Sequence, residues 1–193
     1  MAKFAAAKLR RYEALTVTTT SFEDWIPKPG SFDLVISATA FHWIPAEIAY
    51  PKSALALKDS GSLAVFRNFH LRPAQGFFRE VDALYKECAP EIYRPPAPGD
   101  HDGKKKTEAH MASVRNDFDA SRVFAEVEVR RYPWSEQYDP DQYITLLNTY
   151  SDHINLQEDK RKALFDGIKD LIRRKYSSVT KEYLAVLWFA RKR

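Results

Sequence analysis

The sequence predicts an α/β fold in which helices cover a parallel sheet. One observation is the order within residues 32–66, where an apolar run, a helical segment and a second apolar run at 62–66 follow one another. This alternation favours parallel strands joined by right-handed crossovers. The other observation is the final run at 183–190, which is apolar throughout and therefore suits a strand in the middle of the sheet.

The composition indicates a folded protein of a reducing compartment. The chain has 193 residues and 45% of them are hydrophobic, which is enough to bury a substantial core. The single cysteine, Cys88, cannot form an internal disulfide, and we interpret it as a packing side chain. No export signal or membrane-spanning run is recognisable, so we expect a cytoplasmic protein without a membrane partner. The net charge of +4 forms no clustered basic face, which argues against nucleic acid as a partner.

The first part of the chain predicts two helices and three strands. Residues 2–14 place apolar and basic side chains at helical spacing, and residues 15–20 are β-branched, as strands prefer. Gly30 follows two prolines and predicts a turn with a positive φ. The strand at 32–37 is expected to be buried on both faces, and a helix should run from Pro45 to about residue 57, before the strand at 62–66.

The segment 71–118 is expected to form a helical cap inserted beyond the end of a strand. Residues 77–85 carry an apolar stripe at helical spacing, whereas the Pro-rich residues 94–103 predict a mobile loop. Lys104–Lys106 are assigned to this loop. Three polar residues in or near the loop lack any recognised metal-ligand spacing, so solvated side chains are favoured and no metal site is predicted: His101, Asp102 and His110.

The rest of the chain predicts an edge strand, two helices and the final strand. Residues 123–131 alternate, with Ala125, Val127 and Val129 inward. Asp139 followed by proline is typical of a helix start, and a further helix is expected to begin near Asn155. The apolar stripes of the two helices are Tyr143, Leu146, Leu147 and Tyr150, and Leu164, Ile168, Leu171 and Ile172.

The stretch 31–43 is the candidate binding edge of the sheet. It begins as an apolar strand and then changes to small residues and three rings, at the strand end where ligands bind in open α/β sheets. An alternative stays open, in which the rings pack the corner between strand and helix. The candidate ligand-binding residues here are Ser37, Ala38, Phe41, His42 and Trp43.

Four segments give the chain a resemblance to a known family. Ser21-Phe-Glu-Asp-Trp25, Phe32-Asp-Leu-Val35, Phe41-His-Trp-Ile-Pro45 and residues 57–66 resemble class I S-adenosylmethionine-dependent methyltransferases, above all the small-molecule group that includes trans-aconitate and quinone-biosynthesis enzymes. The resemblance implies a Rossmann-like sheet of order three-two-one-four-five-seven-six. It also implies methyl transfer from S-adenosylmethionine to a small molecule. The family's Gly-rich loop, and the acidic residue that ends its second strand, have no counterpart here.

This departure predicts a sheet without the family's first two strands, within one incomplete domain over residues 1–193. Residues 34–37 would then form an exposed apolar edge. Three explanations stay open: the sheet rearranges, a second copy or another chain covers the edge, or the chain is an N-terminally truncated enzyme, which we favour. Methyl transfer could be lost in such a chain, and the alternatives are a non-catalytic binding module and a subunit that needs a partner chain.

The resemblance also implies roles for single residues near the cofactor. Ser21 would take the place of an aspartate that accepts the adenine amine, and the backbone N–H of Phe22 would reach the ring. The residues from Ser37 to Trp43 named above would flank the sulfonium, whose positive charge is attracted to aromatic faces. For Ser21 and Phe22, an ordinary turn is the alternative.

The substrate side is placed later in the chain. The run Tyr150-Ser-Asp-His153 resembles a substrate-side signature of the family, and Trp134, Tyr150 and His153 are predicted to line the acceptor pocket. Buried aromatic residues also simply fill cores, so that interpretation stays open. Either His153 or His42 could take a proton from the acceptor, and no catalytic residue is assigned.

Overall fold

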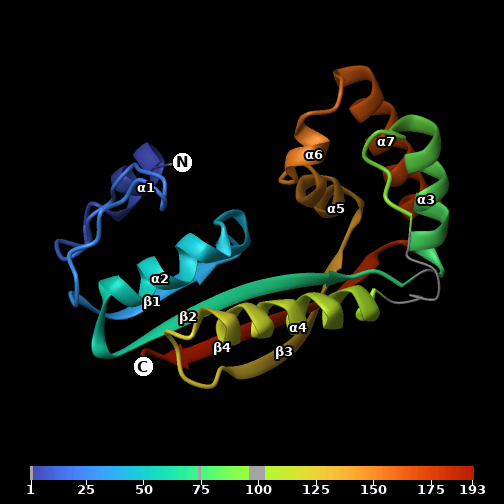
Figure 1. Cartoon of the computed structure of the whole chain (residues 1–193). Helices are drawn as coiled ribbons and strands as arrows, with labels where there is room; N and C mark the ends of the chain where they lie inside the picture. The colour runs from blue at the N-terminus through green and yellow to red at the C-terminus, as the bar shows by residue number, and fades with distance from the viewer. Residues whose placement is uncertain (1, 74, 96–102) are drawn as a thin grey trace. The chain divides into compact units, whose positions relative to one another are not determined.

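The computed structural model describes residues 2–73, 75–95 and 103–193 (Figure 1). They form two compact units, the first from residues up to Val65 with 117–127 and 189–193, the second from 66–116 and 128–188. The predicted loop residues 96–102, with His101 and Asp102, lie outside the described residues.

The first unit contains a helix, an edge strand and a second helix. Its elements are α1 (Ala2–Leu9), β1 (Phe32–Ala38), the short 3-10 helix η1 (Phe41–Trp43), α2 (Ala46–Ala56) and the start of β2 (Leu57–Leu71). The prediction of a strand at 15–20 is wrong, because these residues have no regular structure and are mostly exposed. A β-branched run forms a strand only where a neighbouring strand pairs with it.

The second unit is mainly helical and carries most of the two long C-terminal strands. Its elements are α3 (Phe77–Cys88), most of α4 (Lys104–Ser121), β3 (Glu128–Tyr138), α5 (Pro140–Leu147), α6 (Ser151–Ile154), α7 (Glu158–Leu171), the π-helical turn η2 (Ile172–Tyr176) and most of β4 (Val179–Arg191). Helix α4 corrects the placement of Lys104–Lys106 in a loop. The predicted helices α3, α5 and α7 are confirmed.

The sheet has the order β1-β2-β4-β3. This order matches strands four, five, seven and six of the order that the family resemblance implied. Strand β4 lies inside the sheet, as its apolar run predicted. Strand β1 lies at the edge with Leu34 and Ile36 exposed, so the expected burial on both faces is wrong, and the predicted exposed apolar edge is confirmed.

Strand β3 begins later than the alternating pattern predicted. Regular pairing starts at Glu128, whereas Phe124 forms only an isolated antiparallel bridge to Lys192. The N–H of Ala125 still donates to the carbonyl of Arg191 at 2.8 Å, and Val127 is buried as predicted. Phe124 is buried as well, so the predicted alternation is not kept at the start of this stretch. The edge position of β3 is confirmed.

Two local structures form as the sequence predicted: the capped start of α5 and the turn at Gly30. Asp139 caps α5 by accepting a hydrogen bond from the N–H of Gln142 at 2.8 Å, while the Gln142 side chain accepts from the N–H of Asp139 at 3.0 Å. This reciprocal pair satisfies two backbone donors that a helix start leaves free. Gly30 has a φ of +62°, which glycine adopts without steric cost.

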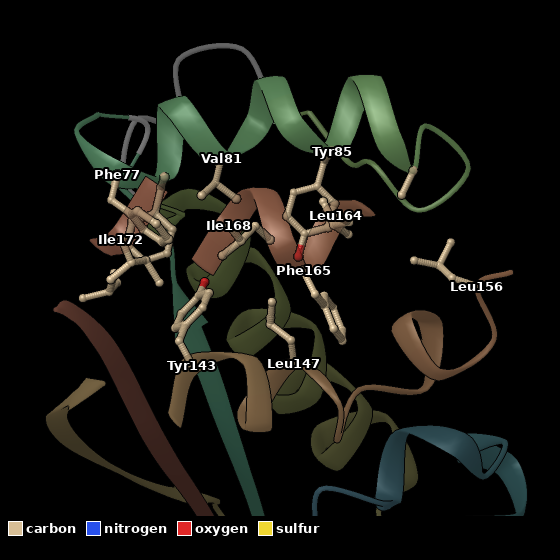
Figure 2. Packing of buried hydrophobic residues seen from close by; sticks show 13 residues of the cluster. Phe77, Val81, Tyr85, Tyr143, Leu147, Leu156, Leu164, Phe165, Ile168 and Ile172 are labelled. Atoms are coloured by element: carbon tan, nitrogen blue, oxygen red, sulfur yellow. The ribbon is translucent and has the colours of Figure 1, made fainter. Parts of the chain in front are cut away.

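The hydrophobic core of the second unit lies between α3, α5 and α7. Figure 2 shows the side chains of Val81, Leu147, Leu164 and Ile168 converging between these helices. The rings of Phe77, Phe78, Tyr85 and Tyr143 also belong to this cluster. Close packing of α3 and α5 on α7 therefore holds these helices together around their shared apolar faces.

We expect Ile168→Ala to lower the free energy of unfolding by about 2–5 kcal/mol, because the side chain is fully buried and truncation leaves a cavity. The matched control is Ile154→Ala, since Ile154 is 51% exposed. Urea denaturation monitored by circular dichroism measures both changes. Equal losses in the two variants would contradict the packing described.

Candidate functional site

The second unit contains a cavity of about 240 Å³ between its helices and strand ends. Its apolar lining comes from α3 and α5, chiefly Phe78, Val81 and Leu147. Its polar lining comes from the ends of β2 and β4, from α3, and from the turn at the start of α6. The polar residues used below are His70, Arg72, Tyr85, Arg94, Tyr150, Asp152, His153 and Lys181.

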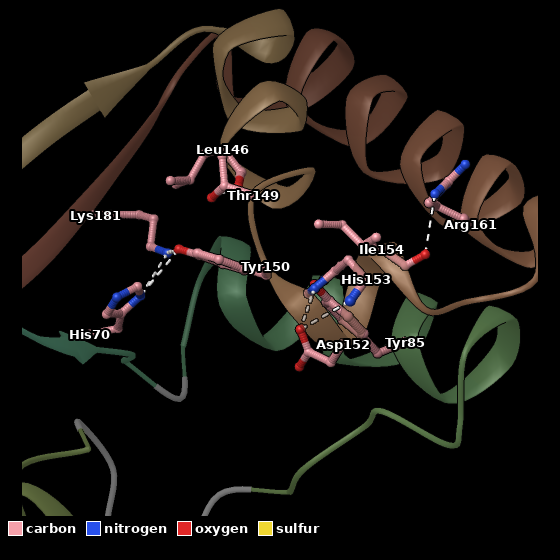
Figure 3. A network of polar contacts seen from close by, with 10 residues as sticks. All are labelled: His70, Tyr85, Leu146, Thr149, Tyr150, Asp152, His153, Ile154, Arg161 and Lys181. Atoms are coloured by element: carbon pink, nitrogen blue, oxygen red, sulfur yellow. Dashed lines mark hydrogen bonds and ion pairs between the residues drawn. The ribbon is translucent and has the colours of Figure 1, made fainter. Parts of the chain in front are cut away.

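One polar network joins Lys181 of β4 to His70 of β2 through Tyr150 (Figure 3). The Lys181 Nζ donates to the Tyr150 hydroxyl at 2.9 Å, and that hydroxyl lies 3.2 Å from His70 Nδ1. Because the ammonium can only donate, Tyr150 accepts from it and gives its own proton toward His70. His70 Nδ1 also lies 3.5 Å from Lys181 Nζ, so this nitrogen is the acceptor of the neutral ring.

The charge of Lys181 is held in a nearly dry environment. The residue is only 6% exposed, and its ammonium lies over the rings of Tyr143, Tyr150 and Tyr183 at 5.9, 5.3 and 5.4 Å from their centroids. The electron-rich ring faces replace part of the lost hydration. Burial, together with the charge of Arg72, lowers the pKa of Lys181 to about 8.

A second network aligns Asp152, His153 and Tyr85, as Figure 3 shows. The Asp152 carboxylate accepts from His153 Nδ1 at 2.9 Å, and His153 Nε2 lies 2.6 Å from the Tyr85 hydroxyl. An Nδ1–H bonded to the carboxylate leaves Nε2 as an acceptor, so Tyr85 donates to it. Burial raises the pKa of Tyr85 above its usual range, which keeps this hydroxyl protonated.

This second network has the geometry of a proton-accepting site. A carboxylate orients an imidazole, and the imidazole faces a hydroxyl that lines the cavity. A ligand hydroxyl bonded to Tyr85 could pass its proton to the tyrosine oxygen while Tyr85 passes its own to His153. The arrangement can therefore serve an acceptor that must lose a proton.

The predicted substrate residues have two different positions. Tyr150 and His153 line the same cavity, and their ring centroids are 5.6 Å apart. Trp134 of β3 is not among the cavity-lining residues: it stacks on Tyr183 at 4.2 Å and donates its indole N–H to Asn68 at 3.1 Å. It therefore supports the wall of aromatic rings around Lys181 from outside.

The predicted cofactor residues all lie in the first unit. Ser37 and Ala38 end β1, and Phe41 is buried with its ring in edge contact with Tyr50, 5.1 Å between centroids. His42 and Trp43 are exposed, with their ring centroids 4.9 Å apart, and Trp43 is 78% exposed. The corner between β1 and α2 thus combines one buried ring with two exposed rings.

Ser21 and Phe22 form a turn, the alternative that the sequence left open. The Ser21 hydroxyl donates to Asp24 Oδ2 at 2.7 Å and accepts from the Asp24 N–H at 3.0 Å. The Phe22 ring packs against Trp25 at 5.6 Å. Lys52 fixes the turn from α2 by donating to the carbonyls of residues 22, 23 and 25.

Thr39, directly after β1, has a φ of +53°. A β-branched residue in the left-handed region is strained, and such strain gathers at functional sites.

Within the described residues, no group of three or more His, Cys, Asp or Glu side chains could hold a metal ion. No helix in the described ranges is both long and apolar enough to cross a membrane.

Sequence reasoning missed Lys181, His70, Arg72 and Tyr85. A signal for Lys181 was present, because Val179, Lys181 and Tyr183 alternate as one buried side of β4, whereas the strand was expected to begin at Tyr183. Tyr85 was placed on the apolar stripe of α3, but its hydroxyl partner is 68 residues away in sequence. No local pattern predicts such a long-range contact.

A sequence comparison finds a relative that is named as a methyltransferase. The chain is 29% identical over 134 residues to the malonyl-[acyl-carrier protein] O-methyltransferase of Geobacter sulfurreducens, a match that covers 69% of this chain and 48% of that protein. The chain thus spans about half the length of this relative. No model of a known protein family matches the chain.

Solved structures show the fold. A candidate type II methyltransferase from Anaeromyxobacter dehalogenans aligns with a TM-score of 0.56 at 18% identity, over 97% of this chain and 76% of that one. A candidate methyltransferase from Bacillus halodurans aligns with a TM-score of 0.52 at 16% identity, over 98% and 77% of the two chains. The predicted α/β class and Rossmann-like methyltransferase fold are confirmed.

We expect the His70 ring to titrate near pH 4, because loss of water around it and the charge of Lys181 lower its pKa to about 4. The residue is exposed as a whole, but its ring packs on Tyr150 and Tyr183 at 5.6 and 5.1 Å. An unfolded histidine titrates near 6.5. The unfolded chain therefore binds the extra proton first, and the free energy of unfolding should fall as pH drops from about 6.5 to 4.

Proton NMR of the His70 ring measures this midpoint, and urea denaturation at several pH values measures the linked stability. His70→Asn should remove that part of the pH dependence. A ring that titrates near pH 6.5 would contradict the network.

We expect Tyr85→Phe to lower the free energy of unfolding by about 1–3 kcal/mol, because it leaves the buried His153 Nε2 without its hydrogen-bond donor. Tyr93→Phe is the matched control, since Tyr93 lines the same cavity. Thermal and urea denaturation compare the two variants. A loss as large in Tyr93→Phe would show that His153 does not depend on the Tyr85 hydroxyl.

Proposed function

Since this chain is related to the class I S-adenosylmethionine-dependent methyltransferases, as its sequence predicted, we propose that it takes part in methyl transfer to a small molecule bound in the cavity of the second unit. The observation that carries the proposal is the sequence match over 134 residues to an enzyme named as an O-methyltransferase. The strand order β1-β2-β4-β3, equal to that of the family's last four strands, supports it.

S-adenosylmethionine is the proposed cofactor, and the end of β1 is its proposed place. Ser37 and Ala38 leave room for close approach, and the exposed rings of His42 and Trp43 suit a sulfonium. The strained Thr39 between them is consistent with a functional turn. Ser21 and Phe22 remain proposed adenine contacts, although the Ser21 hydroxyl would have to exchange its bonds to Asp24.

When bound, S-adenosylmethionine supplies a methyl group that is already activated, so the chain's own contribution is to hold the acceptor and manage its proton. Tyr85 and His153 can take the proton of a hydroxyl acceptor, with Asp152 fixing the imidazole. A carboxylate acceptor has no proton to lose near neutral pH. Both kinds of acceptor are compatible with the proposal.

A non-catalytic module, or a subunit completed by a partner, is the second candidate. The sequence lacks the Gly-rich loop of the family, and Leu34 and Ile36 of the edge strand β1 are 45% and 60% exposed. An apolar edge with unpaired backbone groups invites another strand. A second copy or another chain on β1, and a cytoplasmic location, therefore stay as proposals.

Isothermal titration calorimetry with S-adenosylhomocysteine tests the cofactor proposal. We expect heat of binding, and we expect Trp43→Ala to weaken binding roughly tenfold, because it removes an aromatic face worth on the order of 1–2 kcal/mol. Trp134→Ala is the matched control, as this half-exposed tryptophan lies in the other unit. No heat with the unaltered chain would reject cofactor binding and favour the second candidate.

A further inference from the structure

Lys181 is a buried cation without a counter-ion among the described residues. Its Nζ has two hydrogen-bonding neighbours, the Tyr150 hydroxyl and His70 Nδ1, and both are neutral. The groups that face it are these two, the rings of Tyr143 and Tyr183, and the guanidinium of Arg72, which repels it. A buried charge normally has a paired partner, since the desolvation of an unpaired one is costly.

The other cations of the cavity differ from Lys181 in their pairing or in their exposure to solvent. Arg72 is paired with the Asp82 carboxylate and lies over the rings of Phe78 and Tyr85. Arg94 is exposed and donates to the backbone carbonyls of Glu91 and Tyr93. Lys181 therefore combines burial, a position on the cavity wall and an uncompensated charge.

We propose that the cavity binds a small organic carboxylate, with its anionic end on the Lys181 ammonium and its apolar body against Phe78, Val81 and Leu147. An ammonium has three N–H donors, so one remains for the ligand beside Tyr150 and His70. The carboxylate would supply the missing counter-charge in a dry site, where charge-assisted hydrogen bonds are strong. That this carboxylate is also the methyl acceptor's own group rests on the function proposed above.

The cavity has room for a short acid. Its volume of about 240 Å³ is many times the space of roughly 10–15 Å³ that a cavity needs for one water molecule, so a ligand of hexanoate size can lie in it. The apolar wall formed by Phe78, Val81 and Leu147 excludes a second charge at the far end. The buried positive charge of Lys181 lies at the other end.

The pH dependence follows from the same charge. In the free protein Lys181 has a pKa of about 8, and a bound anion would raise this pKa. The affinity should therefore be constant between about pH 6 and pH 8, where the ligand is ionised and Lys181 is charged, and fall by up to tenfold per pH unit above this range. His70, with a pKa of about 4, stays neutral over this range. The tyrosines that face Lys181 have pKa values raised by burial and stay protonated.

Ligand-observed NMR titration of the full chain with hexanoate, and with the neutral isostere hexanamide, tests the proposal. We expect hexanoate to bind at least tenfold more tightly at pH 7, and we expect this preference to shrink between pH 8 and 10. Lys181→Met should abolish the preference while keeping the apolar contacts. Lys162→Met is the matched control, because Lys162 is exposed and pairs with Asp166 on α7.

Two results would overturn the proposal: equal affinity for the acid and the amide, or a preference for hexanoate that survives in Lys181→Met. The pH series on the unaltered chain tests the same charge even if the variant does not fold, since a preference that stays constant up to pH 10 would also contradict the proposal. The titration uses no cofactor, so it is independent of the calorimetry with S-adenosylhomocysteine. Hexanoate binding without cofactor binding would retain the anion site and reject methyl transfer.

Discussion

Strand β4 lies inside the sheet, and the burial of one of its sides is the constraint on which the second unit depends. The side chains of a strand point alternately to the two faces of a sheet, so every second residue from Val179 to Tyr183 is buried. Val179 and Tyr183 meet that requirement with apolar surface. Lys181 lies on the same side of the strand, so the groups around it must stabilise its buried charge.

Three tyrosine rings surround the Lys181 ammonium, and the properties of tyrosine explain how they stabilise its charge. A tyrosine ring fills space like a hydrophobic residue, while its face attracts a cation and its hydroxyl both gives and takes hydrogen bonds. Tyr150 uses all of these properties, because it stands between Lys181 and His70 and its ring also approaches that of His153. The Lys181–Tyr150–His70 network and the Asp152–His153–Tyr85 network therefore lie on one wall of the cavity.

The first unit shows the opposite situation, at an edge of the sheet. Strand β1 is paired on one side only, by β2, and it exposes large apolar side chains. The proposed cofactor contacts lie where this strand ends, in a corner with one strained threonine and two exposed rings.

The sequence by itself determined much of the local structure. The capping pair of Asp139 and Gln142, the turn at Gly30, the apolar stripes of α3 and α7 and the interior position of β4 all follow from short-range patterns. Such patterns work because capping, φ preference and helical periodicity involve residues only a few positions apart. The family resemblance likewise came from short segments, and it gave Tyr150 and His153 as pocket residues.

Only the tertiary structure decided which polar groups meet. Residues 15–20 have strand-like side chains but no neighbouring strand with which to pair. Lys104–Lys106 begin a helix that local sequence patterns did not predict. Tyr85 meets His153, and Lys181 meets Tyr150 and His70, across 31 to 111 residues of sequence. Contacts of that range depend on how strands and helices pack around a common core. The charge of Lys181 is therefore buried beside Tyr150 and His70 only in the folded chain.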